Sequence, residues 1–163
     1  MFSYSVIPTW KILCSAFKRI DYERINKKIK NSFNCKNFQF VSSSTWALRL
    51  ICELKSEIKS NKNVNIYFPK YYCYDTIKFL KYNKVNIFFY PVDQNLNIEK
   101  SFFTQNNFNS KSTPDIIVGV NYFGKTFDFS DLKDFIELSN TWFVQDSAHS
   151  INIENQKFSH FTI

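Results

Sequence analysis

Short runs of β-type residues alternate with segments of helical periodicity along most of this chain. Strands are predicted at 38–41, 64–68, 85–90, 115–120 and 142–145, with shorter candidates at 151–153 and 161–163. Helices are predicted at 8–30, 45–60, 74–83 and 130–138, the last with Ser130 as its N-cap. Strands that alternate with helices form βαβ units. The predicted fold class is therefore α/β, a three-layer αβα arrangement around a mostly parallel sheet.

The composition limits the functions that are possible for this chain. With 163 residues, 44% hydrophobic and 21% charged, the sequence is typical of one globular domain. Only two glycines are present, and no G-x-G-x-x-G segment exists, which argues against a Rossmann-type dinucleotide site. The predicted organisation is an N-terminal helical segment at 1–36 followed by the α/β region at 37–163.

The net charge of +7 raises the question of nucleic-acid binding. The basic residues are mostly lysines scattered along the chain, and their densest cluster, 24–30, lies on one face of a predicted helix. A solvated helix face explains that cluster better than a nucleic-acid surface does.

Four cysteines are present, at positions 14, 35, 52 and 73, without C-x-x-C spacing or nearby histidines, so no metal site is predicted. No signal-peptide pattern occurs, and no apolar run approaches the ~20 residues of a membrane span. We therefore expect a cytoplasmic protein with reduced thiols.

Ligands of open α/β sheets bind at the carboxyl ends of the strands, and this rule selects three places. The first is the hydroxyl-rich turn Ser42–Trp46, where free helix N–H groups favour an anion such as a phosphate. The alternative is a plain N-cap. The second is the aromatic cluster 68–74, which either stacks on a planar ring or packs the interior. The third is the pair Asp146 and His149. A carboxylate there would keep a heterocyclic nitrogen protonated, or it caps a loop.

Five segments carry a resemblance to a known family. They are Ser43–Leu48 (SSTWAL), Pro69–Cys73 (PKYYC), Tyr90–Asp93 (YPVD), Asn121–Gly124 (NYFG) and Gln145–His149 (QDSAH). Their order and spacing resemble the DegT/DnrJ/StrS family of pyridoxal-phosphate-dependent sugar aminotransferases, of fold type I. The resemblance runs from about residue 7 onward. It implies that 37–163 is part of the large domain of such an enzyme.

The resemblance implies roles for individual residues. Asp146 would pair with the pyridine nitrogen of pyridoxal 5′-phosphate, and His149 would contact the phenolic oxygen of its ring. Ser44, Thr45 and Trp46 would hold the phosphate through hydroxyl and backbone N–H groups.

Three positions depart from the family pattern. Ser44 replaces a glycine, Asn121 replaces the usual histidine, and Cys73 replaces the aromatic that stacks on the ring. Stacking would therefore pass to Tyr71 or Tyr72, or be absent.

The family places its Schiff-base lysine some 20 to 25 residues after the acid, beyond a strand. Here Ser159–Ile163 resembles the start of that strand, and the resemblance assigns the role to no lysine of the chain. We therefore expect no catalytic residue, and a chain that is truncated and inactive alone. Complete relatives transfer an amino group from an amino-acid donor to a keto-sugar nucleotide in surface-polysaccharide biosynthesis, and are generally homodimers.

In the complete family fold, a strand that follows the lysine lies between the first strand and the rest of the sheet. Without it, the strand predicted at 38–41 would expose an edge, so we expect marginal stability or a partner that covers the gap. The alternative to an incomplete aminotransferase is a non-catalytic module of the same fold that binds a ligand or a nucleic acid.

Overall fold

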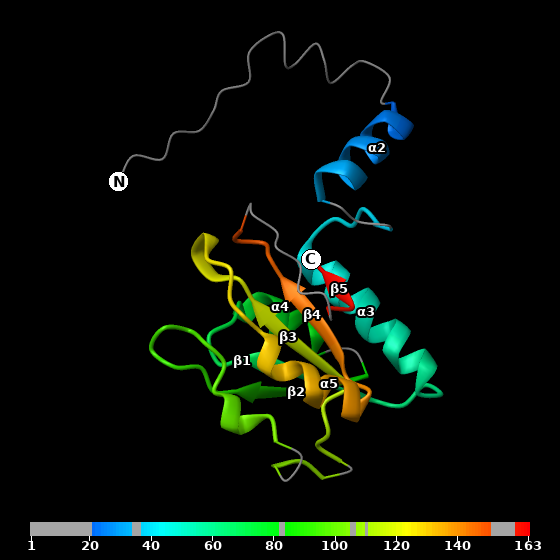
Figure 1. The fold of residues 1–163 in the computed structure, drawn as a ribbon. Helices are drawn as coiled ribbons and strands as arrows, with labels where there is room; N and C mark the ends of the chain where they lie inside the picture. The colour runs from blue at the N-terminus through cyan, green and yellow to red at the C-terminus, as the bar shows by residue number, and fades with distance from the viewer. Residues whose placement is uncertain (1–20, 34–36, 82–83, 105–106, 110, 151–158) are drawn as a thin grey trace. The chain divides into compact units, whose positions relative to one another are not determined.

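The computed structural model describes residues 21–33, 37–81, 84–104, 107–109, 111–150 and 159–163 (Figure 1). The chain forms two units, Met1–Gln39 and Phe40–Ile163, which are described separately. The first contains helix α2 (Tyr22–Phe33), whose start is capped by the Asp21 carboxylate, which accepts from the backbone N–H of Arg24 at 3.0 Å. The part of the predicted N-terminal helix before residue 21 lies outside the described residues.

The second unit is built on a five-stranded sheet in the order β2-β1-β3-β4-β5, and every pair of neighbouring strands is parallel. The strands are β1 (Val64–Pro69), β2 (Val85–Tyr90), β3 (Ile116–Val120), β4 (Trp142–Asp146) and β5 (Phe161–Thr162). These five strands confirm the predicted ones to within one residue at each end. The candidate strand at 151–153 lies outside the described residues.

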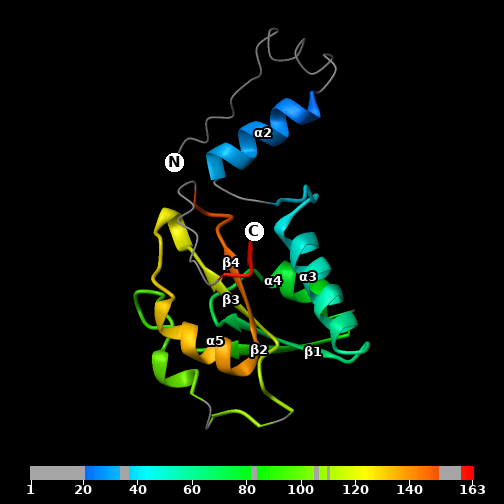
Figure 2. The ribbon, with the colours of Figure 1, turned by 45° about the vertical axis from the view of Figure 1, so that its right-hand side comes forward.

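Helices cover both faces of this sheet (Figures 1 and 2). Helices α3 (Ser44–Ile58) and α4 (Tyr74–Leu80) lie on one face, and α5 (Lys133–Ser139) lies on the other. Short 3₁₀ turns complete the unit: η1 (Lys100–Phe102), η3 (Tyr122–Gly124) and η4 (Ser130–Leu132). The predicted three-layer α/β fold is confirmed, because right-handed βαβ crossovers in opposite directions place α4 and α5 on opposite faces.

Two local predictions were wrong. Residues 38–41 are neither strand nor helix, and they pair with none of the five described strands. A short strand is stable only with a neighbour to pair with, so β-type composition alone does not make this segment a strand. Ser130 is not an N-cap: it lies inside η4, and its N–H donates to the carboxylate of Asp128 at 2.9 Å.

The core lies between the sheet and the helices and is made mostly of β-branched and aromatic side chains. Gly119 of β3 has no side chain, so the rings of Phe143 and Phe129 pack directly against its backbone. A Cβ at this position would lie 2.6 Å from the Phe143 ring and 2.9 Å from the Phe129 ring. The absence of a side chain is therefore a packing requirement here.

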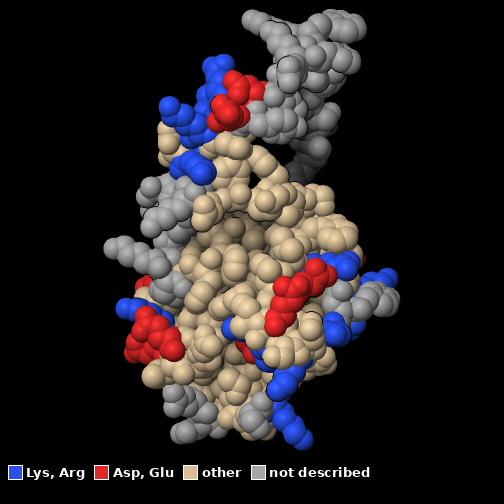
Figure 3. All heavy atoms as spheres, turned by 90° about the vertical axis from the view of Figure 1, so that its right-hand side faces the viewer, with Lys and Arg blue, Asp and Glu red and all other residues tan. Residues whose placement is uncertain are grey.

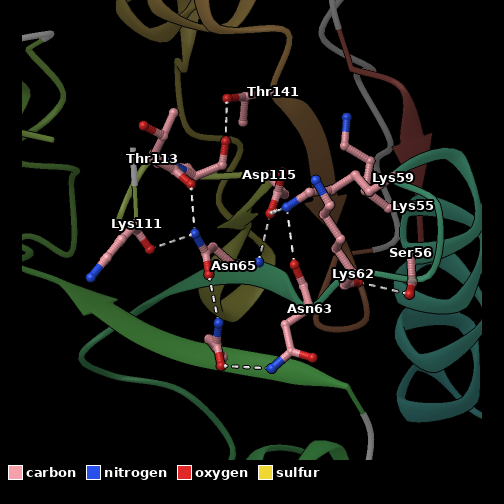
Figure 4. Close-up of polar contacts among 12 residues, drawn as sticks. Lys55, Ser56, Lys59, Lys62, Asn63, Asn65, Lys111, Thr113, Asp115 and Thr141 are labelled. Atoms are coloured by element: carbon pink, nitrogen blue, oxygen red, sulfur yellow. Dashed lines mark hydrogen bonds and ion pairs between the residues drawn. The ribbon is translucent and has the colours of Figure 1, made fainter. Parts of the chain in front are cut away.

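The amino ends of the strands are closed by a polar network (Figure 4). The Asp115 carboxylate accepts from the backbone N–H of Asn65 at 2.8 Å and forms an ion pair with Lys59. The Asn65 side chain donates to the carbonyls of Lys111 and Thr113, both at 3.0 Å. These bonds fix the loop before β3 to the start of β1, so this end of the sheet has a structural role.

The outer side of α3 carries an apolar stripe: Trp46, Leu50, Leu54 and Ile58, all exposed. The four residues recur every fourth position, which places them on one side of the helix. Residues other than Lys, Arg, Asp and Glu make up much of the described surface seen in Figure 3. No helix among the described residues has the length and apolar content needed to cross a bilayer.

Candidate ligand site at the carboxyl ends of the strands

Asp146 is the last residue of β4 and is only 6% exposed. Its Oδ1 accepts from the backbone N–H of Ala148 at 3.0 Å, which turns the chain sharply after the strand. Its backbone carbonyl accepts from the N–H of Asn121, the first residue after β3, at 2.8 Å. Asp146 is therefore held by the ends of two central strands, where the sequence predicts a ligand-binding acid.

Tyr72 reaches the same carboxylate from the loop after β1. Its hydroxyl donates to Oδ2 of Asp146 at 2.7 Å, and its ring packs on Phe68 with centroids 4.6 Å apart. Burial raises the pKa of the Tyr72 phenol well above its usual range, and the charge of Asp146 raises it further. The phenol therefore stays protonated and serves as a donor. The structure thus brings together two residues that the sequence selected separately.

Asn121 fixes the geometry beside this acid. The side chain is fully buried: its Nδ2 donates to the Ser147 hydroxyl at 2.9 Å, and its Oδ1 accepts from the N–H of Phe127 at 3.1 Å. The position was noted only as a departure from the family pattern. A buried asparagine immediately after an apolar strand was a signal that this side chain makes structural hydrogen bonds.

The hydroxyl-rich turn forms the start of α3. Ser43 is the N-cap, and its Oγ accepts from the N–H of Trp46 at 3.4 Å. The hydroxyl of Thr45 shares a hydrogen bond of 3.0 Å with that of Thr76 in α4. The Trp46 ring lies edge-on to Phe79, also in α4, with centroids 5.1 Å apart. Ser44 is half-buried in the same first turn.

The segment from Tyr72 to Thr76 connects this turn with the acid. Tyr72 contacts Asp146 at one end of the segment, and Thr76 contacts Thr45 at the other, one helical turn later. Sequence analysis did not select Thr76. The only signal was a hydroxyl residue in the first turn of a predicted helix, directly before the inward-facing Ile77.

His149 is exposed and lies against η3. Its ring stacks on Phe123 with centroids 6.1 Å apart and an interplanar angle of 19°. Phe123 has a left-handed backbone with φ of 53°, which is unusual for an aromatic residue. This strained turn presents its exposed ring to His149, at the same end of the sheet as Asp146.

These residues fit a phosphorylated pyridine ring in their chemistry. Asp146 is a buried acid, and each of its two oxygens accepts one described hydrogen bond. The first N–H groups of a helix lack intrahelical partners, and α3 carries no acidic residue in its first turn that would repel an anion. The site therefore provides a carboxylate acceptor for a cationic ring nitrogen and a helix N-terminus that favours a phosphate.

Other features of the described chain carry no comparable set of groups. A hollow of about 490 Å³ lies elsewhere, lined by residues that include Asp93, Glu99, Asp128 and Asp131, and by none of the predicted site residues. Among the described residues, no group of three or more His, Cys, Asp or Glu is placed to hold a metal ion. Within the same part of the chain, Cys52 is buried and Cys73 is exposed, and both are free thiols.

Comparison with solved structures places the fold. No protein-family model matches the sequence, and no curated protein does. The structure is similar to a GDP-4-keto-6-deoxymannose-3-dehydratase with a trapped PLP-glutamate geminal diamine (TM-score 0.68, 21% identity, 90% of this chain and 39% of that chain). It is also similar to 3-amino-5-hydroxybenzoic acid synthase (TM-score 0.64, 14% identity, 78% and 33%). A DegT DnrJ EryC1 StrS aminotransferase from Brucella abortus has a TM-score of 0.61 (14% identity, 86% and 39%).

The chain has the fold found in PLP-dependent enzymes of fold type I. The predicted resemblance to the DegT/DnrJ/StrS group is confirmed at the level of fold, because a member of that group is among the similar structures. The chain spans only part of the length of these structures: 39%, 33% and 39% in the order given.

Proposed function

We propose that residues 40–163 form the ring-holding and phosphate-holding part of a pyridoxal-phosphate site in a DegT-type protein. The observation that supports this most strongly is the position of Asp146: a buried acid at the end of a central parallel strand, fixed from both sides by backbone hydrogen bonds. When bound, pyridoxal phosphate supplies an electron-withdrawing ring that stabilises a carbanion.

In this proposal the chain's own residues bind and orient the cofactor. Asp146 keeps the ring nitrogen protonated by its negative charge. The first turn of α3, with Ser44, Thr45 and Trp46, holds the phosphate through N–H and hydroxyl groups. His149 lies at the rim and donates to the ring oxygen.

The proposal extends to binding and not to a catalytic step. The resemblance assigns the role of Schiff-base lysine to no residue of this chain. Two lysines at the end of α3 make structural contacts: Lys55 donates to the carbonyl of Asn140 at 3.0 Å, and Lys59, the C-cap of the helix, pairs with Asp115. We infer that the chain alone does not transaminate. For the complete protein we propose an amino-acid donor and a keto-sugar nucleotide as substrates, a role in surface-polysaccharide biosynthesis, a homodimeric state and a cytoplasmic location.

The test is the affinity for pyridoxamine 5′-phosphate, measured by calorimetry. This compound has the ring and the phosphate but no aldehyde with which surface lysines would react. The intact chain should bind it, and Asp146→Asn should weaken binding at least about tenfold, since the neutral amide no longer favours the ring cation. The matched control is Asp134→Asn, which changes an exposed acid of α5. Equal affinities for the intact chain and Asp146→Asn would contradict the proposed function.

A further inference from the structure

The two oxygens of the Asp146 carboxylate have different partners. Oδ1 is engaged by the N–H of Ala148, two residues further along its own loop. Oδ2 is engaged by the hydroxyl of Tyr72, from a different strand end. Oδ2 is therefore held by a side chain from outside the loop that follows β4.

Tyr72 is itself held in place beside the acid. Asp146 is only 6% exposed, and the ring of Tyr72, whose hydroxyl contacts it, packs on Phe68. A protonated ring nitrogen needs a carboxylate oxygen that it can approach closely and in line. With Tyr72 in this position, both oxygens of the buried carboxylate already accept from a donor.

We propose that Tyr72 is an internal competitor for Asp146, whose hydroxyl must leave Oδ2 before a cationic heterocycle pairs with the acid. This inference rests on the proposed function. The inference adds a definition of the ligand class to that function. An aromatic ring binds at Asp146 only if it has a charged N–H donor that replaces the phenol of Tyr72. A neutral ring offers no such bond in exchange, so Tyr72 selects against it.

The experiment compares two variants of Tyr72 with a matched control. Tyr72→Phe removes the hydroxyl and keeps the ring, whereas Tyr72→Ala removes both. Tyr67→Phe removes a different hydroxyl of the same sheet, one that donates to the Ser112 carbonyl at 2.7 Å. Each protein is titrated with pyridoxamine 5′-phosphate and with benzyl phosphate, which has a phosphate and a ring but no ring nitrogen.

We expect Tyr72→Phe to bind pyridoxamine 5′-phosphate about tenfold more tightly than the intact chain, with no change for benzyl phosphate. Adding Asp146→Asn to this variant should abolish the gain, and Tyr67→Phe should show none. Tyr72→Ala should gain at least as much as Tyr72→Phe.

Three results would overturn the inference. If the intact chain binds and both Tyr72 variants bind equally or more weakly, Tyr72 supports the ring, and the proposed function stands without this competitor. If both variants gain equally for the two ligands, the substitutions only open space. If no variant binds pyridoxamine 5′-phosphate, the proposed function falls and this inference falls with it.

Discussion

The side-chain amide of Asn121 donates to the hydroxyl of Ser147 across 2.9 Å and thereby joins the ends of β3 and β4 beside the acid. Its carbonyl oxygen also holds the N–H of Phe127. We expect Asn121→Leu to lower the free energy of unfolding by about 2–4 kcal/mol, because it leaves buried polar groups without partners. Urea unfolding followed by circular dichroism measures this. Asn95→Leu, at an exposed loop position, should stay close to the unmodified chain; equal losses in both variants would contradict the role of Asn121.

Gly119 should not tolerate a methyl group. Its added Cβ would lie 2.6 Å from the Phe143 ring, so Gly119→Ala forces that ring or the strand to move. We expect a loss of about 1–3 kcal/mol in the free energy of unfolding. Gly119→Ala combined with Phe143→Leu should recover part of it, because the smaller side chain vacates the space. A Gly119→Ala variant as stable as the unmodified chain would show that the contact relaxes freely.

His160 should make the stability of the chain dependent on pH. Its Nδ1 accepts from the N–H of Phe143 at 3.1 Å, and burial lowers the pKa of its imidazole below 6.5, with a further lowering by Lys55. The unfolded chain therefore takes up this proton more readily than the folded chain. The stability contributed by neutral His160 is complete above pH 6.5 and is lost as the pH falls through the folded-state pKa.

Urea midpoints at about pH 7.5 and about pH 5.5 test this effect. The decrease between the two should shrink in His160→Asn, whose side-chain oxygen also accepts a hydrogen bond. His149→Asn, which replaces an exposed histidine, is the matched control. An unchanged decrease in His160→Asn would assign the pH dependence to other groups.

Thr45 should contribute to phosphate binding. Thr45→Val keeps the shape of the side chain but removes its hydroxyl, which now shares a bond with Thr76. We expect the affinity for pyridoxamine 5′-phosphate to fall about threefold to tenfold, and the affinity for pyridoxamine, which lacks the phosphate, to stay the same. Thr113→Val, at the opposite end of the sheet, serves as the control for both titrations. If Thr45→Val lowered the affinity for both ligands equally, Thr45 would not act through the phosphate.

The apolar stripe on α3 should promote association. Leu54 is 40% exposed, so Leu54→Lys should reduce self-association without loss of stability. Leu48, on the inner side of the same helix, is 0% exposed, and Leu48→Lys should unfold the domain. Sedimentation velocity and thermal unfolding separate the two effects. A Leu54→Lys variant that associates as before would assign association to another surface.

The strands and helices were predictable because their signals are local. Pro69 closes β1 and Pro91 follows β2 directly, so both strand ends were visible in the sequence. The segment 38–41 has the same kind of composition but failed as a strand, since its pairing depends on which neighbours the sheet supplies. The β propensity of a segment does not show whether a neighbouring strand is available to pair with it.

The site was predictable in its residue types and not in its contacts. Asp146 and Tyr72 were both selected, because a strand end followed by an acid or by aromatics is a local pattern. The hydrogen bond between them joins residues 74 positions apart and depends on how β1 and β4 flank β3. Thr76 was missed for the same reason, since its partner Thr45 lies on a different helix.

The strand order has a consequence for synthesis on the ribosome. β1 and β2 emerge first and pair directly, and each later strand adds to the same growing edge: β3 on β1, then β4, then β5. Among the strands that the structure describes, none inserts between two that are already paired. The sheet can therefore assemble in the order of translation, because each new strand pairs with an edge strand that has already been synthesised.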